Sequence, residues 1–175
     1  MADSTNQSQE IRDKAKEFVF PSAFTYYEEP LVIEKGQGAT LIDADGREYL
    51  DFFGGILTVG VGHCHPEVVR RTAEQSAKLQ HTSALYLTEP YVHLAEKLAQ
   101  ITPGRLQKSF FTNSGSEANE TAVMAARSHT GNHEVVALRS GYSGRTGVAM
   151  SLTGQAPWRM TGAGTMGGVV HLANP

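Results

Sequence analysis

The sequence predicts an α/β protein in which a small antiparallel β-meander precedes the start of a mainly parallel sheet with flanking helices. Short apolar runs separated by Gly and Asp-Gly turns at 31–51 are typical of the meander. From residue 108 onward the pattern alternates strand, helix and strand, which favours a parallel sheet. Two Gly-rich turns, at 113–116 and 141–144, follow predicted strands at the end where such sheets bind ligands.

The first half of the chain contains the predicted meander and the helices that follow it. Its expected elements are a helix at 11–18, strands at 31–33, 40–42 and 48–51, turns at 36–38 and 43–46, and helices at 66–79 and 90–101. Pro66 suits the first helical position, and Pro103-Gly104 ends the second of these helices.

The second half supplies the predicted parallel sheet. We expect strands at 109–112, 135–138 and 169–172 and a helix at 116–129, which Gly131-Asn132 ends. The chain therefore divides into four segments: a polar leader (1–20), a β-meander (21–62), a helical connection (63–105) and an α/β segment (106–175).

Composition narrows the partners and the compartment. A chain of 175 residues is long enough for a domain with a core, and its net charge of −3 comes from interspersed acids and bases. Nucleic acid and anionic membranes are therefore poor partners, and no apolar run reaches the length of a bilayer span. The polar leader lacks the pattern of a signal or transit peptide. The single Cys64 indicates a reducing compartment, and we expect the cytoplasm.

The stretch 110–120 combines a short apolar strand, a polar turn and a helix start. Ser114 and Glu117 have the spacing of a capping box, and Gly115 allows the backbone to approach a bound group closely. A helix start presents free N–H groups and the positive end of a dipole, which suits a phosphate. An ordinary helix cap explains the same residues equally well.

Asn113-Ser114-Gly115-Ser116-Glu117-Ala118-Asn119 resembles the phosphate-cup motif of class III (ω-type) aminotransferases, and similar stretches extend from about Pro30 to the C-terminus. Within that family the chain most resembles the alanine–glyoxylate aminotransferase 2-like branch. The resemblance implies the N-terminal part of a fold-type I pyridoxal-phosphate-dependent transferase, in which segment 21–62 belongs to the small domain and segment 106–175 begins the large, cofactor-binding α/β domain. It also implies transfer of an amino group from an amino acid or ω-amino compound to a keto acid such as pyruvate or glyoxylate.

The resemblance also assigns site residues. It implies that pyridoxal phosphate contacts Ser114, Gly115, Ser116, Tyr142, Ser143 and Gly144. Tyr142 is expected to stack on the pyridine ring, whereas Ser143 replaces the usual family histidine, so the ring contact at that position is in question.

The same resemblance places three residues of the first half near the substrate. They are Gly55, Ile56 and Tyr86, and an aliphatic Ile56 favours a small or apolar amino donor, although a plain core isoleucine is an equal alternative. The stretch 81–89 resembles a dimer interface, so we expect a homodimer.

The chain contains no expected catalytic residue. The Schiff-base lysine of the family is expected downstream, and Lys108, the last lysine present, would lie about 15 Å from the phosphate along its strand. We therefore expect the N-terminal portion of a longer enzyme, inactive alone. Aminomutase, phospho-lyase and racemase activities on the same scaffold stay open.

Parts of the sequence fit four other kinds of site. Consecutive side chains diverge in His63-Cys64-His65, so no metal site is expected. The letters of Gly162–Gly167 match a dinucleotide fingerprint, but they precede a strand instead of opening a helix. A serine hydrolase with Ser143 as nucleophile lacks the glycine two residues later, where Arg145 stands. A non-catalytic phosphate-binding or interaction module remains the other alternative.

Overall fold

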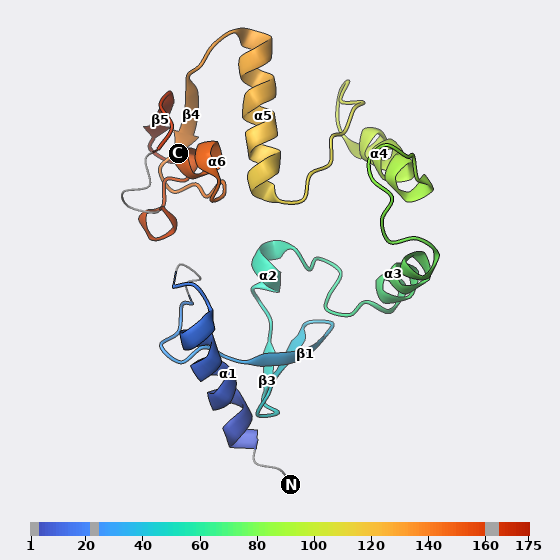
Figure 1. Cartoon of the computed structure of the whole chain (residues 1–175), viewed down its shortest axis with the longest axis vertical. Helices are drawn as coiled ribbons and strands as arrows, with labels where there is room; N and C mark the ends of the chain where they lie inside the picture. Colours follow the sequence, from blue (N-terminus) through green and yellow to red (C-terminus); the bar gives the residue numbers. More distant parts are fainter. Residues whose placement is uncertain (1–3, 22–24, 160–164) are drawn as a thin grey trace. The chain divides into compact units, whose positions relative to one another are not determined.

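The computed structural model describes residues 4–21, 25–159 and 165–175, which fall into two compact units (Figure 1). The first unit comprises residues 1–86 and the second residues 87–175. None of the described helices is long and apolar enough to cross a membrane.

The first unit contains the predicted meander. Its elements are α1 (Ser4–Phe18), β1 (Ile33–Gln37), β2 (Thr40–Asp43), β3 (Glu48–Leu50), the short α2 (Gly54–Leu57) and α3 (Pro66–Lys78). The three strands form an antiparallel sheet in the order β1-β2-β3, with Gln37 opposite Thr40 and Leu41 opposite Tyr49. The antiparallel meander and the helix that begins at Pro66 are confirmed, whereas α1 begins earlier than its predicted start at Ile11.

The first hairpin differs from the prediction in where its turn begins. The expected strand at 31–33 was placed too early, and Gly36, expected in the turn, lies within β1. A Cβ at Gly36 would lie 2.9 Å from the Cβ and Cγ of His63, so glycine permits the strand to pass this ring closely. The turn itself uses Gly38 with a φ of +56°.

The second turn is organised by the buried carboxylate of Asp43. Its Oδ1 accepts the N–H groups of Asp45 (3.0 Å) and Arg47 (2.8 Å), and its Oδ2 accepts the hydroxyl of Tyr49 (2.7 Å). The Tyr49 hydrogen bond is the main reason that the pKa of Asp43 lies below its ordinary value. Ser8 of α1 donates to Asp45 Oδ1 at 2.9 Å, which connects the N-terminal helix to this turn.

The second unit contains the parallel pair of strands. Its elements are α4 (Glu89–Ile101), α5 (Gly115–Thr130), β4 (Val135–Leu138), α6 (Gly147–Leu152), the 3₁₀ turn η1 (Ala156–Trp158) and β5 (Val169–Leu172). Strands β4 and β5 pair in parallel, from Val135 opposite Val169 to Leu138 opposite Leu172, so the predicted parallel pairing is confirmed. Neither α6 nor η1 was predicted.

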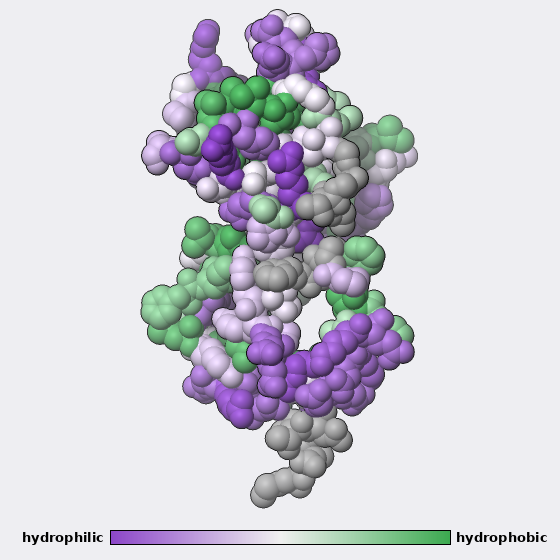
Figure 2. Space-filling view, turned by 90° about the vertical axis from the view of Figure 1, so that its left-hand side faces the viewer, coloured by the Kyte–Doolittle hydropathy of each residue, from purple (hydrophilic) through white to green (hydrophobic). Residues whose placement is uncertain are grey.

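A small apolar core joins α5, α6 and one face of this sheet. Val123 of α5 packs with Val148 and Leu152 of α6, and the sheet contributes Val135, Ala137 and Val169. The alternate positions of both strands are exposed, as expected for a period of two along a strand. Apolar side chains also reach the surface elsewhere, where they appear in green beside the hydrophilic residues in Figure 2.

The predicted strand at 109–112 is wrong. These residues form no strand in the structure, and Phe110 is 76% exposed. A strand requires a hydrogen-bonded partner, and β4 and β5 pair only with each other in the described part of this unit. The segment therefore forms the connection between α4 and α5 (Figure 1).

Candidate functional site

The start of α5 carries the predicted Ser114 cap, and the Glu117 carboxylate bonds to the residue before the N-cap instead of to the N-cap itself. Ser114 is the N-cap in an extended conformation, and its Oγ accepts the N–H of Glu117 at 3.2 Å. The Glu117 carboxylate reaches back to the N–H of Asn113 at 2.7 Å, and the N–H of Ala118 bonds to the Ser114 carbonyl at 3.0 Å. This geometry confirms the cap and fixes the direction in which the helix starts.

The cap leaves two N–H groups of the first turn for a ligand. Within the described ranges, the backbone N–H groups of Gly115 and Ser116 have no hydrogen-bond partner. A Cβ built on Gly115 would meet no atom within 4 Å, so the described residues leave space beside Gly115 itself. The helix dipole adds positive potential at the same place. The cap and an anion site therefore use different N–H groups, and this helix start supports both.

The loop after β4 packs directly against this first turn. Ser116 Oγ accepts the N–H of Arg145 at 3.1 Å, and Asn119 Nδ2 donates to the Ser143 carbonyl at 2.8 Å. Gly144 has a φ of +129°, and a Cβ there would lie 2.9 Å from both Cα and Cβ of Ser116. The structure thus brings the two predicted Gly-rich turns, 113–116 and 141–144, into contact within one unit.

Two residues that sequence reasoning missed hold this loop in place. The fully buried Thr153 accepts the N–H of Ser143 at its Oγ1 (3.0 Å), and its hydroxyl lies 3.1 Å from the carbonyls of Gly144 and Ala149. Oε1 of Glu120 accepts the Thr146 hydroxyl at 2.7 Å and the N–H groups of Val148 at 2.8 Å and Ala149 at 3.3 Å.

The contacts of Glu120 also lower the pKa of its carboxyl group. The Thr146 hydroxyl is the largest influence that keeps the pKa of Glu120 below its ordinary value, with the two backbone N–H groups adding to it. A signal for this residue was present in the sequence. Ser116, Asn119 and Glu120 follow the i, i+3, i+4 spacing of one helical face, so polar side chains here predict a polar neighbour for α5.

Tyr142 belongs to a small aromatic group on the same loop. Its ring meets Trp158 of η1 edge to face, with centroids 6.1 Å apart, and the Arg145 guanidinium lies 5.3 Å from the centre of the Trp158 ring. Tyr142 is 53% exposed, so part of its ring remains accessible to a flat ligand. This geometry is compatible with the stacking role predicted for Tyr142, which stays a prediction.

Gly55 and Ile56, predicted to contact substrate, lie in a left-handed turn in the first unit. Both have a φ of 60°, and Leu57 has 62°. This conformation costs about 1–2 kcal/mol for each residue other than glycine, so neighbouring groups must hold it. Ile56 is 71% exposed within this unit, and both interpretations, a substrate contact and a core isoleucine, stay open.

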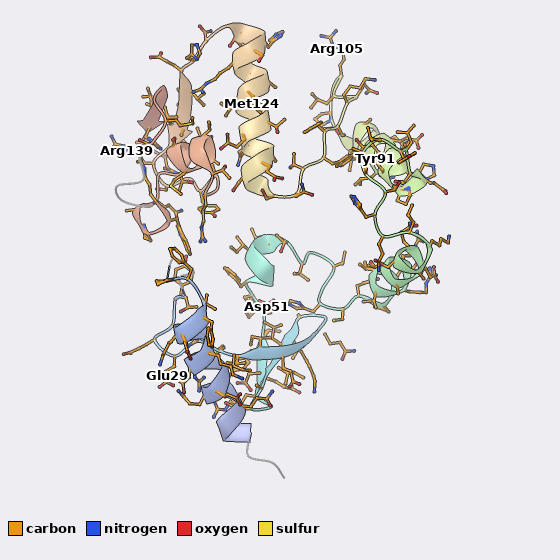
Figure 3. All side chains as sticks on the ribbon, viewed as in Figure 1. Glu29, Asp51, Tyr91, Arg105, Met124 and Arg139 are labelled. Atoms are coloured by element: carbon orange, nitrogen blue, oxygen red, sulfur yellow. The ribbon has the colours of Figure 1, made fainter. Side chains whose placement is uncertain are left out.

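Asp51 holds this turn (Figure 3). Its Oδ1 accepts the N–H groups of Phe53 and Gly54 at 2.9 Å each, and its Oδ2 lies 2.6 Å from His63 Nε2. The contact with His63 is the main reason that the pKa of Asp51 lies below its ordinary value. The backbone of His63 pairs with Gly38 through two hydrogen bonds of 2.8 and 2.9 Å. The turn is therefore fixed to the meander.

The predicted substrate residues and the predicted cofactor residues belong to different units. Gly55, Ile56 and Tyr86 lie in the first unit, and Tyr86 is 68% exposed. The turns at 113–116 and 141–144 lie in the second. That the two sets meet around one ligand stays a prediction.

The remaining sequence interpretations find no support in the described residues. No three His, Cys, Asp or Glu side chains gather there as a metal site, and His63 contacts Asp51 instead. Among the same residues, no histidine bonds to Ser143, as a hydrolase nucleophile would require. Gly162–Gly164 of the dinucleotide pattern lie outside the described residues.

Comparison with known proteins decides the family. The model of the family aminotransferase class-III matches residues 23–175. The chain belongs to the class-III aminotransferases. Among curated relatives of this aminotransferase chain, alanine–glyoxylate aminotransferase 2 homolog 2, mitochondrial, of Arabidopsis thaliana is 45% identical over 94% of the chain. Human alanine–glyoxylate aminotransferase 2, mitochondrial, is 41% identical over 83% of it. The predicted resemblance is thereby confirmed.

Solved structures of aminotransferases confirm the predicted fold as well. The taurine:2-oxoglutarate aminotransferase of Bifidobacterium kashiwanohense, solved with PLP and glutamate, matches 96% of this chain with a TM-score of 0.85 and 30% identity. An (S)-enantioselective omega-transaminase from Thermomicrobium roseum matches 95% with a TM-score of 0.83 and 28% identity. The chain spans 34% and 28% of the two curated relatives named above, and 38% and 40% of these two structures.

Proposed function

We propose that the first turn of α5 binds the phosphate of pyridoxal phosphate and that the protein transfers an amino group from an amino acid to a keto acid. The observation that carries the proposal is the pair of N–H groups on Gly115 and Ser116, which have no partner in the described residues and lie at a helix start where a Cβ on Gly115 would meet no atom within 4 Å. Membership of the class-III aminotransferases supports the cofactor, and the structure of one relative contains PLP.

The hydroxyl groups of the same turn suit an anion. Ser114 Oγ and Ser116 Oγ each accept a backbone N–H, from Glu117 and Arg145 respectively. Because that bond occupies an acceptor position, each hydroxyl keeps its own proton for donation to a phosphate oxygen. Two N–H groups and two hydroxyls then converge on the positive end of the helix dipole. Each charge–dipole contact of this kind is worth about 0.3–1 kcal/mol, so several must act together.

The loop after β4 supplies the contacts to the ring. Tyr142 offers an aromatic face, and Gly144 brings the loop backbone against Ser116 without a side chain between them. Ser143 is proposed to make a smaller ring contact than the histidine of the family. Pyridoxal phosphate, once bound, supplies the electron sink that transamination needs.

The catalytic groups are proposed to lie on sequence beyond Pro175. The relatives are about three times as long as this chain, and all six lysines here occur at or before Lys108. We propose that the Schiff-base lysine, the carboxylate for the pyridine nitrogen and the substrate-binding arginine follow in the full-length polypeptide. A homodimer in the cytoplasm, a small or apolar amino donor next to Ile56, and a keto acid such as pyruvate or glyoxylate complete the proposal.

The test uses the full-length polypeptide that carries this chain. Adding pyridoxal phosphate to the apoprotein should produce visible absorbance that bleaches with an amino donor and returns with a keto acid. A panel of donors and acceptors then identifies the pair. Absence of such absorbance, together with labelling of Ser143 by a fluorophosphonate, would instead support the hydrolase. Phosphate binding without bleaching by any donor would support a non-catalytic module.

A further inference from the structure

The loop between β4 and α6 is held by side chains from one face of α5. Ser116, Asn119 and Glu120 contact the loop at Arg145, Ser143 and the 146–149 backbone respectively. Ser116 and Asn119 each make one such hydrogen bond, whereas Glu120 accepts three. Glu120 is therefore the main attachment point on α5 for the end of the loop and the first turn of α6.

The groups that donate hydrogen bonds to Glu120 have no ready access to another acceptor. Val148 is 8% exposed and Ala149 is fully buried, so water cannot readily replace the carboxylate at their N–H groups. Thr146, the N-cap of α6, makes no side-chain cap bond to its own helix and donates its hydroxyl to Glu120 instead. Without the carboxylate, these groups can regain hydrogen bonds only with water, and for that the loop and the first turn of α6 must move toward solvent.

Such a movement would be transmitted to Tyr142. The loop runs from Tyr142 through Gly144, which has room for no side chain against Ser116, to the Glu120 contacts. Ser116 belongs to the turn in which the N–H groups of Gly115 and Ser116 have no partner among the described residues, and Glu120 follows one turn later on the same helix. The distance between the phosphate-binding turn and the Tyr142 ring therefore depends on where Glu120 holds the loop.

We infer that Glu120 is a positioning residue, which holds the Tyr142 loop against the first turn of α5 so that one pyridoxal phosphate is contacted at its phosphate and at its ring together. This inference rests on the proposed function. The competing explanation is that Glu120 only stabilises α6 as a cap supplied from another helix. The two differ in one respect: a positioning residue is coupled energetically to Tyr142 in cofactor binding, whereas a stabilising residue is not.

The experiment is a double-mutant cycle in the full-length polypeptide. Pyridoxal phosphate is titrated into the apo forms of the wild type, Glu120→Ala, Tyr142→Ala and the double variant, and thermal melts of the same apo forms are recorded. Glu120→Asp, which keeps the charge but loses reach, replaces the alanine variant if that one does not fold. Glu120→Gln keeps both length and an acceptor oxygen and serves as the rescue. Val123→Ala, in the core on the same helix, is the control for lost stability.

We expect Glu120→Ala to raise the Kd of pyridoxal phosphate by about tenfold and to reduce the further effect of Tyr142→Ala to less than about threefold. Glu120→Gln should recover most of the affinity. Val123→Ala should melt earlier but keep both the wild-type Kd and the full Tyr142→Ala effect. An unchanged Kd in Glu120→Ala, or effects of the two variants that simply multiply, overturns the positioning role alone. A wild type that does not bind pyridoxal phosphate overturns the proposed function and the positioning role with it.

Discussion

Gly115 allows cofactor binding to be separated from helix capping with one substitution, Gly115→Asp. Gly115 is the first residue of α5, its φ lies outside the left-handed region, and a Cβ there would meet no atom within 4 Å. Aspartate therefore fits the apoprotein without strain. If a phosphate binds at this turn, the same carboxylate occupies its place and repels it. The variant should consequently have a more stable apo form and a much weaker affinity for pyridoxal phosphate.

The two effects have opposite signs and measurable sizes. Replacing a helical glycine and adding an acidic group at the helix start together stabilise the apo form by about 1–2 kcal/mol. For a full-length polypeptide about three times as long as this chain, with an unfolding entropy of about 2.1 cal/mol/K per residue, that raises Tm by about 1–2 °C. Two like charges about 4 Å apart near a protein surface repel by about 4 kcal/mol, so the Kd should rise by roughly a thousandfold.

The assay pairs thermal melts of the apo form with absorbance titrations of pyridoxal phosphate. Gly115→Ala is the matched control, since it replaces the glycine without adding charge. It should share most of the gain in Tm and lose much less affinity. An aspartate variant that binds the cofactor as the wild type does would show that this turn is only a helix cap. An apo form that melts earlier would show that glycine is required here for the backbone conformation.

Two further substitutions test the structure around the site. Gly144→Ala should lower both Tm and the affinity for the cofactor. An alanine at this positive φ costs about 1–3 kcal/mol, and its Cβ would overlap Ser116. Thermal melts and the titration of pyridoxal phosphate measure the two effects. Asp51→Asn should remove a pH-dependent part of the stability. The pKa of Asp51 lies below its ordinary 3.8, chiefly because of His63, so its contribution is present above that value and is lost as pH falls through the lowered folded value. Urea unfolding of both forms from neutral pH to about pH 2 should therefore show curves that converge toward acid. If the stabilities of the wild type and Asp51→Asn differ by the same amount at every pH, Asp51 makes no pH-dependent contribution.

Elements with strong local signals could be predicted from the sequence. The helices that begin at Glu89 and Gly115 were expected within a residue, because proline or a capping box marks each start. The segment at 109–112 was not, because strand formation depends on a partner elsewhere in the chain. Helix α6 was missed for a related reason: its N-terminal N–H groups are satisfied by Glu120, a residue far away in the sequence.

The candidate site divides in the same way. The Ser114 cap and the open Gly115 turn depend on neighbouring residues, so their spacing alone indicated them. The role of Thr153 could not be predicted from the sequence. A buried threonine is recognised as the residue that holds a loop only when the loop that it contacts is known. Gly36 was predicted to lie in a turn, because glycine is common there. The actual reason for glycine is the close approach of His63, which is far away in the sequence and could not be foreseen from it.

A substitution at Ser143 is expected to strengthen cofactor binding, whereas the substitutions above weaken it or lower stability. Its backbone is fixed from both sides without its side chain, because the N–H donates to Thr153 and the carbonyl accepts from Asn119. Ser143→His can therefore restore the family residue without moving the loop, and apo stability should stay within about 0.5 kcal/mol of the wild type. An added ring contact with the cofactor is worth about 0.5–1.5 kcal/mol, so the Kd of pyridoxal phosphate should fall by about two- to tenfold. The control is Ser143→Ala, which should change the Kd little. If the histidine variant binds more weakly while the alanine variant matches the wild type, the space beside Ser143 is needed open, and the ring is held by Tyr142 alone.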